Sequence, residues 1–309
     1  MAKKIKEEKE MSFLDHLEIL RWHLVRSTAA VFLFSIVAFI MKGFVFNTIL
    51  FAPKDAHFIT YRFFCEVSKI FGTDGLCIED IPFTFQSLAM AEQFSVHIWT
   101  SLTVGFILAF PYIIWEFWKF ISPGLYEKER KGAFLFILIS SFLFFVGVLF
   151  GYYVVTPLSV NFLGNYSVSE VVERNITIGS YIALVRSSSL ASGLIFELPI
   201  VMFFLTKMGL VTPEFLKKYR KHALVVVLIL AAIITPPDII SQIIVGIPIM
   251  ILYEVSIYIS KMVIEPEQKK GLKNKIFYFI ISLVFCGGII WVYLNFSAIS
   301  TYILDLLGR

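Results

Sequence analysis

Residues 187–200 read SSSLASGLIFELPI and lie inside a long apolar segment that runs from Tyr181 to Leu205. One carboxylate, Glu197, interrupts this segment, and Pro199 follows it two residues later. A charged side chain deep in a bilayer costs roughly 2.5–3.5 kcal/mol on insertion scales, so it usually faces a protein interior or a wet cavity. We therefore expect other helices to form a polar recess around Glu197.

The composition is that of a protein that crosses a membrane several times. Of its 309 residues, 58% are hydrophobic and only 16% are charged, whereas a soluble domain carries about 25% charged residues. The net charge of +4 therefore does not indicate a nucleic-acid partner. Charged residues are frequent in the first twenty positions, so no cleavable signal peptide is expected. We predict an all-α integral membrane protein.

Seven apolar segments are candidates for transmembrane helices, for which a full span needs about 20 residues. They comprise residues 24–41, 94–115, 133–155, 181–205, 223–235, 239–258 and 276–296. Gly287, Gly288 and Asn295 weaken the seventh segment. We expect a cytoplasmic tail and the start of the first helix at 1–23, a six-span domain at 24–261 with an outer loop at 43–93, and a cytoplasmic linker with an extra span at 262–309.

The fifth segment and the turn after it predict a short helical hairpin. Residues 223–235 number about 13 and cover roughly 20 Å, which is less than a hydrocarbon core of about 30 Å. Pro236 and Pro237 block helix continuation, and only Asp238 separates them from the next apolar run. We therefore expect short fifth and sixth helices that thin the bilayer or leave a polar notch above them.

Positive charges predict the orientation of the chain. Lys and Arg are concentrated before the first segment and in the second, fourth and sixth loops, while the alternate loops contain few of them. By the positive-inside rule, the N-terminus and these basic loops are cytoplasmic.

Two cysteines share the predicted outer loop. An oxidising compartment would allow Cys65 and Cys77 to form a disulfide, and two unpaired cysteines in an amphipathic loop helix are the alternative.

Sequence motifs of enzymes and cofactor sites are absent. The chain has no H-E-x-x-H, no G-x-S-x-G and no P-loop. Of the five histidines, only His97 lies inside a predicted span. We expect no catalytic residue, no metal site and no cofactor.

Five motifs follow one another along the chain. They are residues 16–23 (HLEILRWH), 120–131 (FISPGLYEKERK), 196–199 (FELP), 235–242 (TPPDIISQ) and 248–254 (PIMILYE). In order and spacing they resemble the TatC family, the multispanning subunit of the twin-arginine protein translocase, over about residues 12–261.

The resemblance implies a concave six-helix bundle in the bacterial cytoplasmic (inner) membrane. Such a subunit binds twin-arginine signal peptides of folded proteins at the cytoplasmic face and recruits small single-span subunits of the TatA and TatB type. It forms an oligomer surrounded by membrane lipid, contacts no nucleic acid, and takes part in transport that draws on the proton-motive force.

The second loop carries one candidate residue for reading the signal. Glu129 lies among Lys128, Arg130 and Lys131, which is also typical of a solvated charge cluster at the start of a helix. A carboxylate pairs bidentately with a guanidinium, which a lysine matches poorly. The resemblance implies that Glu129, beside Arg130, accepts an arginine of the signal peptide, and we favour this interpretation.

The N-terminal motif departs from the family pattern His-Leu-x-Glu-Leu-Arg-x-Arg. His16 and Arg21 keep their positions, but Ile19 replaces the glutamate and His23 replaces the last arginine. Glu18 is adjacent to Ile19, yet one residue turns a helix by about 100°. Glu18 therefore replaces the missing carboxylate only if the local helix is rotated or frayed.

The fourth segment contains two charged residues, Arg186 and Glu197, close to three helical turns apart. They can share one face, although roughly 16 Å along the axis prevents direct pairing. The resemblance implies that Glu197 lines an intramembrane pocket, for which Arg186 is a further candidate. A buried structural carboxyl is the alternative. A rival function is a proton-coupled small-molecule transporter that uses Glu197 as its proton site.

Thr235, Asp238 and Gln242 cluster around the hairpin. Asp238 can cap the sixth helix by accepting from its free N–H groups, which alone would explain it. The resemblance implies that this polar region contacts the single-span partner subunits, because a polar residue on a lipid-facing hairpin is a good hydrogen-bond site for another helix.

Overall fold

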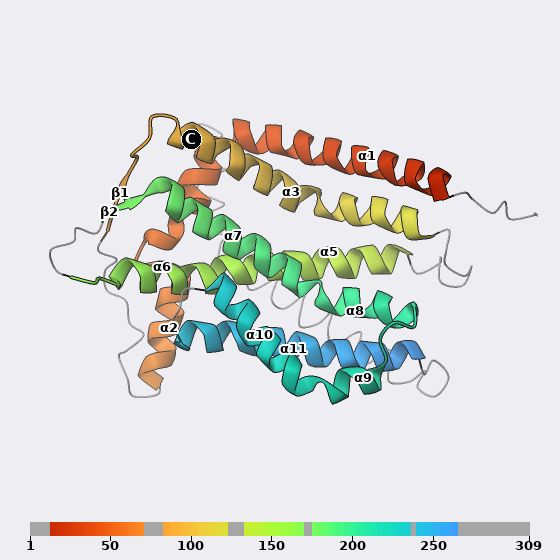
Figure 1. Cartoon of the computed structure of the whole chain (residues 1–309). Helices are drawn as coiled ribbons and strands as arrows, with labels where there is room; N and C mark the ends of the chain where they lie inside the picture. The colour runs from red at the N-terminus through yellow and green to blue at the C-terminus, as the bar shows by residue number, and fades with distance from the viewer. Residues whose placement is uncertain (1–12, 71–82, 123–132, 170–174, 236–238, 265–309) are drawn as a thin grey trace, which may run out of the picture.

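The computed structural model describes residues 13–70, 83–122, 133–169, 175–235 and 239–264, which are mainly helical. Figure 1 shows the long helices lying side by side in a bundle, with α1 at one edge and α10 and α11 toward the other. The longer elements are α1 (Phe13–Ile40), α2 (Ile59–Ile70), α3 (Glu92–Ile121), α5 (Ala133–Phe150), α6 (Thr156–Asn165), α7 (Ile178–Phe196), α8 (Leu198–Lys207), α10 (Arg220–Ile234) and α11 (Ile239–Ile264). The short elements are η1 (Phe44–Leu50), η2 (Ala52–Lys54), η4 (Gly151–Val155), α9 (Pro213–Lys218), β1 (Thr84–Gln86) and β2 (Asn175–Thr177).

Five stretches are long and apolar enough to cross a membrane. They are Leu17–Ile40, Glu92–Ile121, Phe134–Asn165, Ile178–Lys207 and Ser241–Met262. These stretches coincide with the first four predicted segments and the sixth, which confirms the all-α membrane architecture. The fifth helix, α10, has 15 residues and is short as predicted. The seventh predicted segment, 276–296, lies outside the described residues.

The sixth helix is not short, contrary to the prediction. α11 has 26 residues and continues past the apolar run to Ile264. Its polar end continues as helix because it packs against α8: the hydroxyl of Thr206 donates to that of Ser260 over 2.9 Å, and both residues are buried. A run of apolar residues therefore marks the membrane-embedded part of this helix and not its full length.

Small residues join α7 closely to α5 and η4. A Cβ added at Gly151 would lie 2.5 Å from the Ser188 carbonyl oxygen, so only glycine allows this approach. Next to this contact, the hydroxyls of Thr156 and Ser188 are 2.7 Å apart. The contact places the end of α7, and with it Glu197, against the interior of the bundle.

The end of the bundle that contains β1 and β2 is closed by the segment that follows α1 (Figure 1). β1 pairs in parallel with β2, with Thr84 opposite Asn175. Three tyrosine hydroxyls donate to backbone carbonyls of this segment: Tyr61 to Pro53, Tyr152 to Ile49 and Tyr181 to Leu50, over 2.7–2.9 Å. Cys65, on α2, is disulfide-bonded, and its predicted partner Cys77 lies outside the described residues.

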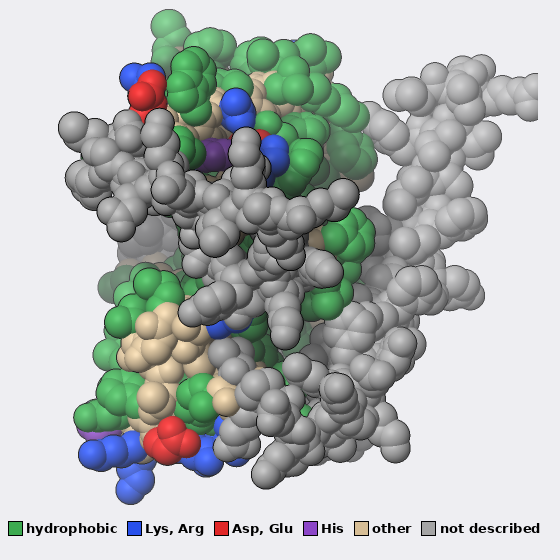
Figure 2. All heavy atoms as spheres, turned by 90° about the vertical axis from the view of Figure 1, so that its right-hand side faces the viewer, with side chains coloured by type: hydrophobic (Ala, Val, Ile, Leu, Met, Phe, Trp, Pro, Cys, Tyr) green, Lys and Arg blue, Asp and Glu red, His purple; other side chains and the backbone are tan. Residues whose placement is uncertain are grey.

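The opposite end of the bundle, which we call the charged end, holds the start of α1, the end of α3 and α9. Figure 2 views this end and shows Lys, Arg, Asp, Glu and His side chains in two groups, with hydrophobic side chains around them. This is the end that the distribution of positive charge predicts to be cytoplasmic.

Candidate functional site

The start of α1 presents Glu18 and Arg21 on its surface. Their side chains form an ion pair at 3.5 Å within one helical turn, and each is 65% exposed. His16 lies on the same helix, while Glu129 and Arg130 lie outside the described residues. Since α1 is helical from Phe13 onward, Glu18 is not brought into the direction of Ile19 by fraying of the helix.

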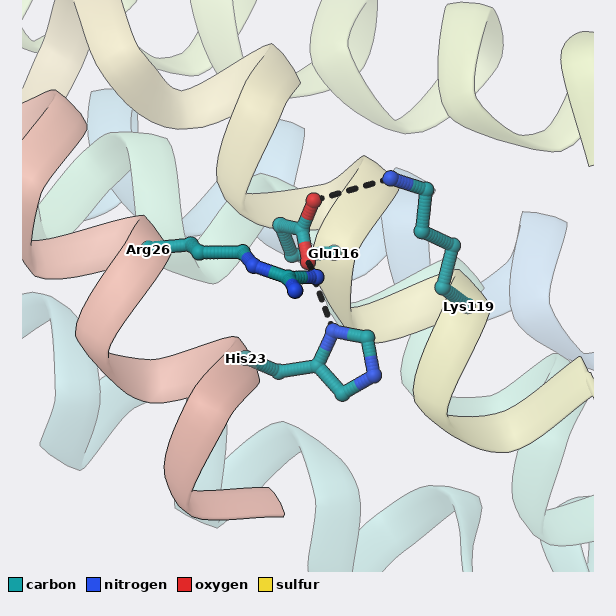
Figure 3. A network of polar contacts seen from close by, with 4 residues as sticks. All are labelled: His23, Arg26, Glu116 and Lys119. Carbon is teal, nitrogen blue, oxygen red and sulfur yellow. Dashed lines mark hydrogen bonds and ion pairs between the residues drawn. The ribbon is translucent and has the colours of Figure 1, made fainter. Parts of the chain in front are cut away.

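The strongest polar cluster at the charged end joins α1 to α3 around Glu116, which is only 1% exposed. Its Oε2 lies 2.6 Å from Nδ1 of His23 and 3.8 Å from the guanidinium of Arg26, both on α1. Its Oε1 accepts from Nζ of Lys119 over 2.9 Å, one turn further along α3. Figure 3 shows the side chains from both helices converging on this one carboxylate. The buried negative charge is therefore compensated from two sides.

Sequence reasoning did not identify Glu116. The predicted second segment ends at residue 115, whereas α3 continues to Ile121 and carries Glu116 into the contact with α1. A signal was present in the motif WEFWKF at 115–120, where a single carboxylate stands among aromatic residues and Lys119 follows one turn later. Its partners on α1, His23 and Arg26, are 93 and 90 positions away, so no local pattern indicates them.

Glu197 lies in the interior between α7 and α8 and is 8% exposed. The hydroxyl of Ser140, on α5, donates to its Oε2 over 2.8 Å. Its Oε1 has no hydrogen-bond partner among the described residues. α7 ends directly before Glu197, and α8 begins directly after it with Pro199 in its first turn, so the carboxylate lies at a break in the span.

Arg186 is half-buried on α7, in the same membrane span as Glu197. Within the described part of the chain no ion pair joins the two residues, in agreement with the distance expected from the helical rise. The span thus contains a carboxylate with one free oxygen and, about three turns away, an arginine.

The described polar residues of the hairpin do not form the lipid-facing polar patch that was expected. Thr235 is 4% exposed, and its hydroxyl donates to the Ala231 carbonyl of its own helix over 2.8 Å. Gln242 donates through Nε2 to the Leu228 carbonyl over 2.9 Å and so connects α11 to α10. Asp238 lies outside the described residues. Internal hydrogen bonds therefore occupy both described side chains.

The part of the chain that the structure describes contains no group of three or more His, Cys, Asp or Glu side chains able to hold a metal ion. The chemistry at the charged end is instead that of carboxylates and guanidinium groups, which suits the binding of charged peptides.

The chain is similar in sequence to Sec-independent protein translocase proteins. The family model described as TatC, Sec-independent protein translocase protein, matches residues 15–248. The Sec-independent protein translocase protein TatC of Blattabacterium sp. subsp. Periplaneta americana (strain BPLAN) is 43% identical over 256 residues, covering 82% of this chain and 96% of that protein. The TatC protein of Desulforapulum autotrophicum is 38% identical over 252 residues, covering 82% of this chain and 85% of that protein.

Solved structures agree with the sequence relatives. A crystal structure described as the twin arginine translocase receptor TatC matches with a TM-score of 0.61 at 33% identity, covering 81% of this chain and 100% of that chain. The chain therefore belongs to the TatC family of Sec-independent protein translocase proteins.

Proposed function

We propose that this protein is the receptor subunit of a twin-arginine translocase in the bacterial cytoplasmic membrane, with its N-terminus in the cytoplasm. It binds twin-arginine signal peptides of folded proteins at the charged end of the bundle. The observation that carries this proposal is the match, over 81% of the chain, to a structure named as the twin arginine translocase receptor. The concentration of charged side chains at one end supports the orientation.

Two carboxylates are assigned to recognition of the arginine pair, Glu129 and Glu18. A guanidinium forms two parallel hydrogen bonds with a carboxylate, which an ammonium group cannot do. Glu18 is exposed and held by Arg21 in an ion pair that an incoming guanidinium can replace, because exposed pairs of this kind contribute only about 0–1 kcal/mol. We assign three further residues to the same site because they belong to the two sequence motifs that contain Glu18 and Glu129: His16, Arg21 and Arg130.

Glu197 is buried in the bundle interior, and we assign it to the floor of the binding region, below the surface residues. Its carboxylate keeps one oxygen without a partner among the described residues, so it can accept a further hydrogen bond. Arg186, on α7, supplies the other charged group of this span. A polar floor of this kind accommodates a segment that enters the membrane from the charged end.

Single-span partner subunits of the TatA and TatB type bind at the hairpin of α10 and α11, and the complex is oligomeric. α10 is 15 residues long and exposes a row of apolar side chains: Leu224, Val225, Ile229 and Ile233. The polar residues assigned to this contact are Thr235, Asp238 and Gln242. For Thr235 and Gln242, the partner must either compete with their internal hydrogen bonds or add to them.

The proposed function is tested by the export of a reporter that carries a twin-arginine signal peptide. We expect Glu129→Ala to abolish export and Glu129→Asp to reduce it less, because aspartate keeps the carboxylate. Losing one partner of a charged hydrogen-bonded pair costs about 2–5 kcal/mol, which is more than a tenfold loss of affinity. Glu127→Ala, two residues away in the same charged motif, is the matched control and should retain export.

Undiminished export by a Glu129→Ala, Glu18→Ala double variant would contradict the assignment of these residues. The rival function, a proton-coupled transporter that uses Glu197, is tested with the purified chain in liposomes. The translocase proposal expects no solute-dependent proton flux from this chain alone, and a flux that Glu197→Gln abolishes would favour the rival.

A further inference from the structure

α1 is the most peripheral of the five candidate membrane spans. Only 11% of its membrane-spanning window is buried, against 28–39% for the other four candidate spans. Figure 1 shows it at the edge of the bundle beside α3. Among the described elements its packing is almost entirely against α3, so its rotation and axial position are set by its contacts with that one neighbour. Since α1 carries Glu18 and Arg21, these contacts also decide where those two side chains lie.

The contacts between α1 and α3 occur at three levels. Near the β1–β2 end, the ring of Phe39 stacks on His97 with centroids 3.9 Å apart. In the middle, a Cβ at Gly105 would collide with Ser35, so the two backbones lie very close together. At the charged end, His23 and Arg26 meet Glu116. Packing therefore holds the first two levels, and a buried carboxylate holds the third.

The contact at Glu116 is specific because it is electrostatic and buried. All ion pairs that connect α1 with another described helix end on this carboxylate. His23 and Arg26 are three residues apart and share one face of α1, so together they fix the rotation of the helix. Removing one partner of a buried pair is strongly unfavourable, since the remaining charge is left without compensation.

The two surface residues lie close to this contact along the helix axis. Arg21 is two residues and Glu18 five residues from His23, which corresponds to roughly 3 Å and 7.5 Å of helical rise. The outer contact at Phe39 is roughly 27 Å from Arg21 on the same scale. A small rotation of the start of α1 would move Glu18 and Arg21, and of the three contacts with α3 the one at Glu116 lies nearest to them.

We infer that Glu116 is a positioning residue for signal-peptide recognition: it holds His23 and Arg26 so that α1 presents Glu18 and Arg21 in register with the end of α3. This inference rests on the proposed function. It assigns Glu116 no contact with the peptide, since the side chain is almost wholly buried and three basic groups already surround it.

The experiment measures the dissociation constants of a labelled twin-arginine signal peptide and of its twin-lysine counterpart for the purified full chain in nanodiscs. We expect Glu116→Gln to weaken arginine-peptide binding about tenfold, which corresponds to about 1.4 kcal/mol, and to leave lysine-peptide binding nearly unchanged. Glu116→Asp should recover part of the preference. The ratio of the two constants is the readout, because a general loss of folded protein changes both equally.

Two matched controls separate positioning from loose packing. His97→Ala weakens the other end of the contact between α1 and α3, and Glu254→Ala removes an ion pair with Arg220 at the charged end of α10 and α11. Both should keep the wild-type ratio. If Glu116→Gln does not fold, a His23→Ala, Arg26→Ala double variant releases α1 while Lys119 still neutralises Glu116, and it should show the same loss.

A charge exchange distinguishes positioning from direct binding. Glu116→Lys with Arg26→Glu rebuilds an ion pair between the two helices in the reversed sense, and it should restore most of the preference that Glu116→Lys alone removes. A folded exchange variant without recovery would show that the carboxylate itself binds the peptide, which overturns the inference. A wild-type ratio in Glu116→Gln would overturn it as well. A wild-type chain without any preference for arginine would instead refute the proposed function.

Discussion

Glu116 and Glu197 are two buried carboxylates in the same bundle, and their surroundings are opposite. Glu116 is 1% exposed and lies among three basic side chains from α1 and α3. Glu197 is 8% exposed, accepts one hydrogen bond from Ser140, and keeps one oxygen without a partner in the described part of the chain. The two side chains are therefore similarly buried, but the charge of Glu116 is compensated by basic groups, whereas Glu197 has a hydrogen-bond acceptor that is unsatisfied among the described residues.

The difference indicates which carboxylate maintains the structure and which is open to further contact. A fully paired charge stabilises the position of its partners but has little capacity left for a ligand. A buried acceptor with a free oxygen costs stability and remains available for another donor. Burial alone would have assigned Glu116 and Glu197 the same role. Their hydrogen-bond and ion-pair partners distinguish the two roles.

The largest effect that would sharpen this comparison is expected for Glu116→Lys. The substitution places a fourth basic side chain among His23, Arg26 and Lys119, and we expect the free energy of unfolding to fall by about 3–5 kcal/mol. Glu18→Lys, an exposed change on α1, should cost less than about 1 kcal/mol. Denaturant unfolding in detergent micelles measures both, and equal losses would contradict the account of a buried compensated charge.

An intermediate effect is expected when each carboxylate is replaced by its amide. Glu116→Gln should cost about 1.5–3 kcal/mol, because an amide cannot balance the basic groups around it. Glu197→Gln should cost less than about 1 kcal/mol, because the amide oxygen still accepts from Ser140 and no cation loses its partner. The same unfolding measurement compares them, and the comparison fails if Glu197→Gln is as costly as Glu116→Gln.

The smallest effect concerns the one hydrogen bond to Glu197. Ser140→Ala should destabilise the chain by about 1 kcal/mol more than Ser141→Ala, since the neighbouring Ser141 hydroxyl is buried without a partner among the described residues. In a Glu197→Ala background this difference should vanish, as a double-mutant cycle would reveal. Persistence of the full difference would mean that Ser140 acts through another group.

The spans could be predicted from the sequence because a segment that crosses the membrane is rich in apolar residues over its own length. The apolar runs identified the first four spans and the sixth, and the two prolines after Thr235 identified the end of the short α10. The predicted end of the sixth helix was wrong. Ser260 is polar, and it is buried because it contacts Thr206 on α8, which the apolar pattern does not indicate. Hydropathy predicts only the part of a helix that lies in the membrane, and the helix itself can continue beyond that part.

The candidate site was less accessible to sequence reasoning. Glu197 was recognised because a single carboxylate in an apolar run is conspicuous, and the structure places it in the interior at the break between α7 and α8. Glu116 was missed because its partners on α1 are distant in the chain and it lies one residue beyond the predicted segment. Thr235 was expected on a lipid-facing surface, yet its hydroxyl bonds to its own helix. Pairings across helices are decided by tertiary packing, which no local pattern contains.

Site-specific photo-crosslinking of a twin-arginine signal peptide to the membrane-embedded chain tests the central claim most directly. Probes placed at positions 18, 129 and 197 report contact with the two surface residues and with the buried carboxylate position. We expect adducts at 18 and 129 that disappear with a twin-lysine peptide. Absence of adducts at both surface positions, with a wild-type signal peptide bound, would contradict recognition at the charged end.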